Sequence, residues 1–341
     1  MPLAGHAPAA GRKPRVHLVN PMLNPSGGSE WRTISLYRQL EPAADVRIWH
    51  FREAPSDAFS NVRLSRIDTR KLSFPRGGTL VFVGVYFNIS HWIRLARPRR
   101  VILTYNTPDA ERLAAKVDLI RKTCGLEPEI VFCSRELAEQ VPYKGVVELS
   151  LVDLDAFTPS DRSGRTGFRL GRLSRDAPEK HHPEDMTLYA ELAQQGCEVD
   201  ILGATVEMQT APLATSSANV HMRPLGSVKA PEFLHGLDCF FYRTSPLWAE
   251  PWGRVIIEAM ASGLPVVTDR TSGASSVIEH GRNGLLFDTT QEAFDLVMRL
   301  KTDSALRESL GKAARETAEN LLSAEVRAQV QAFYLHPRAP S

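Results

Sequence analysis

The chain has 341 residues, of which 43% are hydrophobic and 23% charged, and its formal net charge is +2. This composition excludes a disordered protein, and no apolar run approaches the roughly 20 residues that a membrane-spanning helix needs. The charge is uneven, because residues 1–160 hold 22 Lys and Arg against 16 Asp and Glu. This excess indicates an anionic partner, such as a membrane surface or a phosphorylated acceptor, although ordinary surface variation explains it equally well.

The first part of the chain alternates strand-like and helix-like segments. Residues 1–14 are small, polar and basic, lack the apolar centre of a secretion signal, and are predicted to form a flexible leader. Strands are predicted at residues 15–20, 46–51, 79–87, 99–105 and 129–134, and helices at 29–40, 107–122 and 135–141. The alternation indicates a parallel sheet covered by helices. Residues 15–157 are therefore predicted to form a Rossmann-like domain on the acceptor side.

The alternation resumes after a segment rich in Gly, Pro and Ser at residues 154–167. Strands are predicted at 168–173, 198–204, 238–243 and 265–270, and helices at 183–195, from 253 to a cap at Gly263, and throughout 290–335. This gives a second Rossmann-like domain at 158–320, and a C-terminal helix at 321–341 packing back toward the first. The predicted fold class is α/β, with two doubly wound domains facing a cleft that binds ligand.

Cysteine and histidine spacing gives no sign of a metal centre. The four cysteines form no C-x-x-C pair, and the histidines lack the i,i+4 spacing of a zinc helix. We expect free buried thiols, no metal and no cofactor, in a cytoplasmic protein. A location at the inner face of the membrane is the alternative, in which Arg97, Arg99 and Arg100 face lipid or acceptor unless they form a solvated basic face.

The motif AEPWGRVIIEAMASGLPVV spans residues 249–267 and holds two acids eight residues apart. A helix that begins near Gly253 presents unpaired N–H groups and partial positive charge, and glycine lets a phosphate approach the backbone. Glu258, about two turns in, then lies roughly 7–8 Å along the axis, where its carboxylate can hold a ribose diol. Glu250 lies before the helix and can hold a second sugar. This order suits a nucleotide diphosphate-sugar.

The same motif resembles the E-x7-E signature of retaining GT-B glycosyltransferases of group 1, family 4. Other segments resemble that family too, namely PSGGSE at 25–30, VFCSRELAEQV at 131–141, LVDLDAFTP at 151–159, GRLSRDAPEK at 171–180 and SGASSVIEHGRNGLLFD at 272–288. The resemblance covers about residues 15–320 and is most specific in the second domain.

The resemblance implies a role for each matching residue of the donor site. Arg172 and Lys180 would neutralise the diphosphate, although their spacing is longer than the family usually has. Glu250 would bind the donor sugar, so these three residues form the predicted catalytic set. The predicted donor-binding residues are Glu258 at the ribose, Gly253, Arg254 and Val255 through their backbone amides, and Gly27 and Gly28 of the glycine loop.

The acceptor side departs from the family pattern. The family often carries a histidine after the strand at 99–105, and this chain has Asn106 there, with Asp109 nearby. Asparagine can hydrogen-bond a sugar but cannot act as a base. In retaining enzymes of this kind the donor phosphate is thought to deprotonate the acceptor, so the departure concerns acceptor handling more than donor binding.

The predicted function is a retaining hexosyltransferase-type glycosyltransferase. It would move a sugar from a nucleotide-sugar, with GDP-mannose as first choice and UDP- or dTDP-sugars as alternatives, to a hydroxyl of a glycan or glycolipid. The expected setting is bacterial surface polysaccharide or lipopolysaccharide synthesis. Two alternatives remain open at this point: a nucleotide-sugar epimerase on the same fold, and a non-catalytic protein that binds nucleotide-sugars. No motif for nucleic-acid binding is present.

Overall fold

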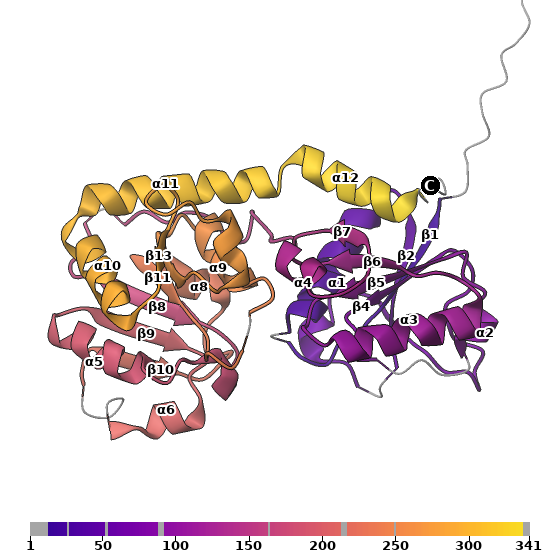
Figure 1. Cartoon of the computed structure of the whole chain (residues 1–341), viewed down its shortest axis with the longest axis horizontal. Coiled ribbons are helices and arrows are strands. Elements are labelled where there is room, and N and C mark those ends of the chain that lie inside the picture. The colour runs from indigo at the N-terminus through magenta and orange to yellow at the C-terminus, as the bar shows by residue number, and fades with distance from the viewer. Residues whose placement is uncertain are drawn as a thin grey trace, which may run out of the picture. The chain divides into compact units, whose positions relative to one another are not determined.

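The computed structural model describes residues 13–25, 27–51, 54–87, 92–162, 164–212, 217–248 and 250–336. The chain forms two compact units, each a parallel sheet with helices packed against it (Figure 1). Unit 1 takes up residues up to Phe132, Val141–Glu148 and the chain from Arg327, and unit 2 takes up Cys133–Gln140 and Leu149–Val326. The division at residue 157 expected from the sequence differs from this grouping. The predicted leader at 1–14 lies almost wholly outside the described residues.

The sheet of unit 1 has the strand order β3-β2-β1-β4-β5-β6-β7, with every pair parallel. Its strands are β1 (Arg15–Val19), β2 (Asp45–His50), β3 (Leu64–Arg66), β4 (Thr79–Val83), β5 (Arg100–Tyr105), β6 (Glu129–Phe132) and β7 (Gly145–Val147). Its helices are α1 (Gly28–Leu40), η1 (Asp57–Phe59), α2 (Trp92–Ala96) and α3 (Ala110–Cys124). The predicted strand 79–87 stops at Val83, because Gly84 turns the chain with a φ of +94°.

The C-terminal segment contributes to the core of unit 1. Helix α12 (Ala324–Leu335) places Tyr334 among the buried side chains of β1, β4 and α1. Arg100 donates to the carbonyl oxygens of Phe333 and Tyr334, at 2.5 and 3.3 Å, and pairs with Glu129. Arg100 is therefore a buried anchor for the last helix and does not belong to an exposed basic face.

The sheet of unit 2 has the order β10-β9-β8-β11-β12-β13 and is also parallel throughout. Its strands are β8 (Arg169–Leu173), β9 (Glu198–Leu202), β10 (Val220–Arg223), β11 (Cys239–Tyr242), β12 (Val266–Asp269) and β13 (Leu285–Phe287). Its helices are α4 (Arg135–Glu139), η2 (Pro178–Lys180), α5 (Asp185–Gln194), α6 (Val206–Thr210), α8 (Ala230–His235), α9 (Arg254–Ala261), η3 (Gly273–Val277), α10 (Thr290–Thr302) and α11 (Ser304–Leu321).

The strand order of unit 2 changes direction between β8 and β11. Right-handed crossovers then place α5 and α9 on opposite faces of the sheet, and the carboxyl ends of β8 and β11 open a crevice at this point. The helix predicted throughout 290–335 is three helices, α10, α11 and α12. Asp303 accepts from the backbone N–H of Leu306 and caps α11, and a second break separates Leu321 from Ala324. Among the described helices, none is long and apolar enough to cross a membrane.

Acid is expected to destabilise unit 1 through His17. Nδ1 of this buried histidine accepts from the Trp49 indole (3.0 Å), and Nε2 faces the Arg76 carbonyl oxygen (3.3 Å). Burial lowers the pKa of His17 from 6.5 to about 4. Between these pH values the unfolded chain binds the proton and the folded chain does not, so the free energy of unfolding falls as the pH falls. The expected contribution is about 1.4 kcal/mol per pH unit.

Urea unfolding of the wild type and His17→Phe at pH 7, 6 and 5 measures this contribution. The wild type is expected to lose stability more steeply than the variant over this range. Parallel pH profiles for the two proteins would contradict the assignment to His17.

Candidate donor site in unit 2

The start of α9 is built as an anion site. Gly253 is its N-cap residue, with a φ of +67°, and no side chain caps this end of the helix. A Cβ at Gly253 would lie 3.0 Å from Cδ1 of Ile256 and 3.5 Å from Oγ of Ser272, so a larger residue would be strained there. The Ser272 hydroxyl is buried without a hydrogen-bond partner among the described atoms. The uncapped amides and this hydroxyl are donors that a phosphate could accept from.

Glu250 lies three residues before the N-cap Gly253 and has two partners. Its Oε2 is 2.5 Å from Nζ of Lys180 and accepts from the hydroxyl of Tyr242 at 2.6 Å. The Lys180 ammonium also lies 5.0 Å from the centre of the Trp248 ring. Burial, with the Glu250 charge, raises the pKa of Tyr242 well above its ordinary value, so this hydroxyl stays a donor. The structure thus brings Lys180 and Glu250 together.

Arg172 supports the backbone near Lys180. Its side chain is fully buried (0% exposed), and it donates to the carbonyl oxygens of Lys180 and Arg243, the latter at 2.8 Å. Its guanidinium also lies 5.0 Å from the Tyr242 ring centre. The contact of Arg172 with a donor phosphate stays a prediction.

Asp185 holds the buried cations of the crevice in place. It is fully buried at the start of α5, its Oδ1 accepts from Nε of Arg243 at 2.6 Å, and its Oδ2 is 3.9 Å from Nε of Arg172. Arg243 donates in addition to the Thr290 hydroxyl at 2.8 Å. One carboxylate therefore pairs with two guanidinium groups that have left water, an arrangement that is costly to break.

Glu258 lies in the second turn of α9, which begins at Arg254. Its side chain is 7% exposed, and Oε1 accepts from Nε of Arg254 at 2.8 Å. Burial raises the pKa of Glu258, and Arg254 opposes this rise. Glu258 is the fifth residue after the N-cap Gly253, which is about 7.5 Å of helix rise at 1.5 Å per residue and fewer than two turns.

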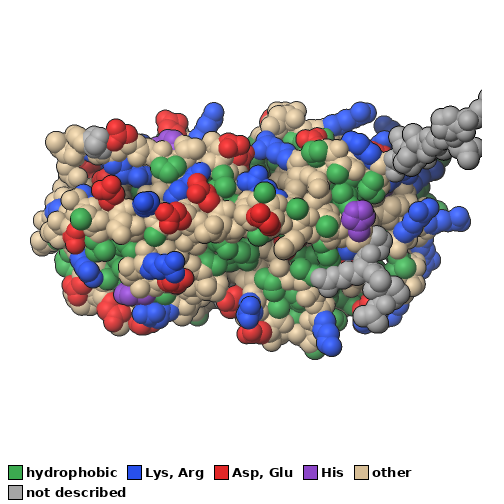
Figure 2. Space-filling view, turned by 90° about the horizontal axis from the view of Figure 1, so that it is seen from above, with side chains coloured by type: hydrophobic (Ala, Val, Ile, Leu, Met, Phe, Trp, Pro, Cys, Tyr) green, Lys and Arg blue, Asp and Glu red, His purple; other side chains and the backbone are tan. Residues whose placement is uncertain are grey.

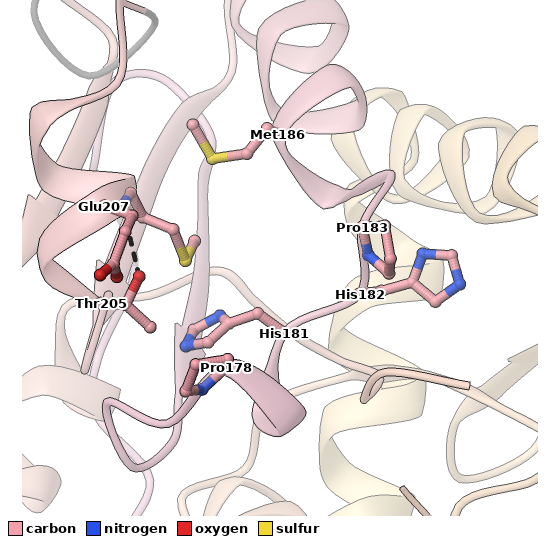
Figure 3. Close-up of a pocket in the computed structure, with 8 residues that line it drawn as sticks. Pro178, His181, His182, Pro183, Met186, Thr205 and Glu207 are labelled. Carbon is pink, nitrogen blue, oxygen red and sulfur yellow. Dashed lines mark hydrogen bonds between the residues drawn. The ribbon is translucent and has the colours of Figure 1, made fainter. Parts of the chain in front are cut away.

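A pocket of about 270 Å³ lies beside Lys180, between the loops that follow β8 and β9. Figure 3 shows His181, Met186, Thr205 and Glu207 around it. His181 Nε2 lies 3.0 Å from the Gly203 carbonyl oxygen, and burial with the nearby Arg172 charge lowers its pKa to about 3. His181 therefore stays neutral at physiological pH and cannot add a positive charge next to Lys180.

The carboxylate of Glu30, in the first turn of α1, lies beside the glycine loop of unit 1. Gly27 precedes α1 with an ordinary φ of −76°, and a Cβ there would lie 2.1 Å from Oε2 of Glu30. Glu30 is buried and accepts from the Ser29 hydroxyl at 2.7 Å, so this carboxylate faces the positive end of α1. A Cβ at Gly28 would meet nothing within 4 Å. A side chain at Gly27 would displace the Glu30 carboxylate, whereas the local structure leaves space at Gly28.

The predicted acceptor-side residues follow β5 in unit 1. Asn106 lies beside Gly84, where an added Cβ would be 3.4 Å from its Oδ1. Asp109 caps α3 by accepting from the backbone N–H of Arg112 at 3.0 Å, and it also accepts from the Tyr86 hydroxyl at 3.0 Å. The backbone hydrogen bond from Arg112 is the main cause that lowers the pKa of Asp109. Asp109 is therefore an ionised helix cap and not a general acid.

Three residues of the crevice were missed in the sequence: Asp185, Tyr242 and Arg243. Polar residues at the carboxyl ends of parallel strands often face ligands, and this rule points to Tyr242, which ends β11, and to Arg243, which follows it. No comparable signal marks Asp185, an acid at the start of a helix. Among the described residues, no group of three or more His, Cys, Asp or Glu side chains is arranged to hold a metal ion.

Comparison with known proteins indicates the family of the second unit. Residues 168–317 match the family model described as glycosyl transferases group 1. This part of the chain is therefore similar to the group 1 glycosyl transferases. The match contains every donor-site residue predicted in unit 2, and it confirms the family indicated by the motif at 249–267.

Curated proteins match this chain over only part of its length and part of their own. The chain is 40% identical over 79 residues to spore coat protein SA of Bacillus subtilis (strain 168), covering 22% of this chain and 21% of that protein. It is 27% identical over 187 residues to a GDP-mannose-dependent alpha-(1-6)-phosphatidylinositol monomannoside mannosyltransferase of Mycobacterium tuberculosis, covering 48% of this chain and 49% of that protein. The chain thus spans a fifth to a half of the length of these relatives.

Solved structures resemble the whole chain. HepE of Anabaena, crystallised in complex with UDP-glucose, aligns with a TM-score of 0.68 at 16% identity, over 94% of this chain and 98% of that one. Similarity at this identity concerns the fold. It confirms the predicted class of two Rossmann-like domains, including the first domain, which lies outside the family match.

Proposed function

We propose that this protein is a glycosyltransferase that takes its sugar from a nucleotide diphosphate-sugar. The observation that carries the proposal is the crevice of the group 1 domain, where the uncapped start of α9 follows directly on the pair formed by Lys180 and Glu250. An anion-binding helix end beside an acid suits a ligand that carries a diphosphate next to hydroxyl groups. The family match of residues 168–317 supports this assignment.

The diphosphate, the ribose and the transferred sugar of the donor would each contact a different group at or near α9. The diphosphate would accept from the backbone amides at Gly253, Arg254 and Val255 and pair with Lys180, while the ribose diol would donate to Glu258. The transferred sugar would then reach Glu250, whose carboxylate is already oriented by Tyr242. A donor phosphate would also compete with Glu250 for Lys180, so donor binding would free the carboxylate for the sugar hydroxyls.

Transfer would occur with retention of the anomeric configuration. The bond between the anomeric carbon and the diphosphate oxygen would break, and the acceptor hydroxyl oxygen would bond to that carbon on the same face. The acceptor proton would pass to the leaving phosphate, so no protein base is needed. The chain would supply position and charge, with Lys180 and the start of α9 stabilising the leaving diphosphate. No metal or cofactor takes part in this proposal.

GDP-mannose remains the first choice of donor, with UDP- and dTDP-sugars as alternatives. The Mycobacterium tuberculosis relative is named for GDP-mannose, and the HepE structure contains UDP-glucose, so the similar proteins support both nucleotides. The proposed acceptor is a hydroxyl of a glycan or glycolipid in bacterial surface polysaccharide or lipopolysaccharide synthesis. Asn106 would hydrogen-bond that acceptor.

Product analysis separates this proposal from its two alternatives. The full chain is incubated with GDP-mannose, UDP-glucose or dTDP-glucose and a glycolipid extract, and nucleoside diphosphate release and the anomeric NMR couplings of the product are followed. We expect acceptor-dependent release and a retained α-linkage. A changed sugar still attached to its nucleotide would indicate an epimerase, and binding without release would indicate a non-catalytic protein.

Glu258→Ala is expected to weaken the binding of the free nucleoside diphosphate by about 1–3 kcal/mol, a roughly 5- to 150-fold rise in Kd. The reason is the loss of charged acceptors for the ribose hydroxyls. Isothermal titration measures the change, and Glu279→Ala is the matched control, because that acid is exposed and pairs only with Arg282 at 2.5 Å in the described structure. Equal Kd values for Glu258→Ala and the wild type would contradict the proposed contact between Glu258 and the ribose.

A further inference from the structure

A basic and apolar surface lies at the amino edge of the unit 1 sheet, away from the strand ends that carry Asn106. It is made by two segments, residues 68–78 before β4 and residues 92–99 before β5, and we call it the amino-edge surface. Backbone hydrogen bonds join the segments, from Gly77 to Ala96 at 2.7 Å and from Arg99 to Gly78 at 2.9 Å. The two segments therefore form one connected face.

The amino-edge surface carries mostly positive charge. Its exposed cations are Arg70, Lys71, Arg76, Arg94, Arg97 and Arg99, and none of them has a carboxylate within ion-pair distance among the described residues. Its one acid, Asp68, uses its side chain to accept from the backbone N–H groups of Arg70 and Lys71, at 3.0 and 3.3 Å. Figure 2 shows Lys and Arg side chains gathered at the right-hand end of unit 1. These cations are available to an anionic partner.

Two leucines project from the same surface. Leu72 is 66% exposed and Leu95 is 55% exposed, each beside cations of its own segment. Leu72 is held in a tight turn, with Asp68 and Ser73 bonded to each other through their backbones at 2.7 and 2.9 Å, and with a φ of +55°. Exposed leucines among unpaired cations are typical of a surface that inserts into the headgroup region of an anionic bilayer.

We propose that the amino-edge surface docks the protein on an anionic phospholipid membrane, with Leu72 and Leu95 entering the interface and the surrounding cations facing lipid phosphates. The positive charge alone would also suit a nucleic acid. A phosphate backbone, however, offers no apolar region into which the two exposed leucines could insert. The surface is independent of the proposed transfer reaction, because its segments lie before β4 and β5 and the acceptor residue Asn106 lies after β5.

Vesicle co-sedimentation of the full chain tests this proposal. Vesicles of phosphatidylcholine alone are compared with vesicles containing 30 mol% phosphatidylglycerol, at 0.1 and 0.5 M NaCl. One variant carries Lys71→Glu and Arg94→Glu, and a second carries Leu72→Ser and Leu95→Ser. The matched controls are Arg282→Glu with Lys312→Glu, and Val206→Ser with Leu247→Ser, which change exposed residues of unit 2 in the same way. Circular dichroism melts confirm that each variant folds.

The wild type is expected to bind the anionic vesicles and to lose at least about tenfold in partition at high salt or on neutral vesicles. Each amino-edge variant is expected to lose about tenfold or more, and each control less than twofold. Absence of wild-type binding, or equal losses in variants and controls, would overturn the proposal. So would loss in the charge variant alone combined with salt-sensitive binding of single-stranded RNA, which would identify a nucleic-acid surface.

Discussion

Glu250→Ala is expected to reduce sugar transfer by about a hundredfold or more while leaving the Kd for free nucleoside diphosphate within about twofold. The carboxylate faces the position proposed for the transferred sugar, and the diphosphate is proposed to rest on the start of α9 and on Lys180. Loss of Glu250 also removes the ion-pair partner of Lys180, 2.5 Å away, so the ammonium remains available to phosphate. Turnover with saturating donor and titration with nucleotide measure the two effects separately.

Glu250→Gln is the companion variant, because it keeps the size of the side chain and an oxygen that accepts from Tyr242. We expect it to retain more activity than Glu250→Ala, since an amide still hydrogen-bonds sugar hydroxyls. If Glu250→Ala and Glu258→Ala weakened nucleotide binding by the same amount, the division of roles between the two acids would be wrong.

Asp185→Ala is expected to lower the free energy of unfolding of unit 2 by about 3–5 kcal/mol. The substitution leaves the guanidinium groups of Arg243 and Arg172 in a buried site without their carboxylate, which lies 2.6 and 3.9 Å from them. Because Arg172 supports the Lys180 backbone, nucleotide binding should weaken as well. Urea unfolding followed by circular dichroism measures the loss.

Asp200→Ala provides the control for this substitution. Asp200 is also buried and pairs with an arginine, Arg223, at 2.7 Å, but the side chain of Arg223 is 43% exposed and can turn to water. The expected loss is therefore about 1 kcal/mol. Similar losses for Asp185→Ala and Asp200→Ala would show that burial of the two cations near Asp185 has no special cost.

The fold was largely readable from the sequence for one physical reason. Parallel strands buried on both faces give continuous apolar runs, and helices between them give 3.6-residue periodicity, so the two sheets left a clear pattern. The start of α9 was indicated by the Pro-Trp-Gly sequence before it. Gly253 adopts the left-handed conformation that glycine favours, and the helix begins at the next residue, Arg254.

What the sequence did not reveal depends on contacts between distant residues. The hydrogen bond from Arg172 to the carbonyl oxygen of Arg243 joins residues 71 positions apart, and no local pattern encodes it. Asp185 was missed because a single acid at a helix start is usually a solvated cap. The break at Asp303 was missed because the two helices are separated by this one capping residue, with neither Gly nor Pro to mark the boundary.

Thermal stabilisation by nucleotides tests the central claim most directly. The wild type and Glu258→Ala are melted with GDP, UDP, ADP and dTDP and with their sugar forms. A ligand present at a hundred times its Kd adds about 2.7 kcal/mol of stability, which is readily measured. The account predicts that one nucleotide family stabilises the wild type clearly and the variant much less. No stabilisation by any nucleotide, or equal stabilisation of both proteins, would contradict the placement of the donor along α9.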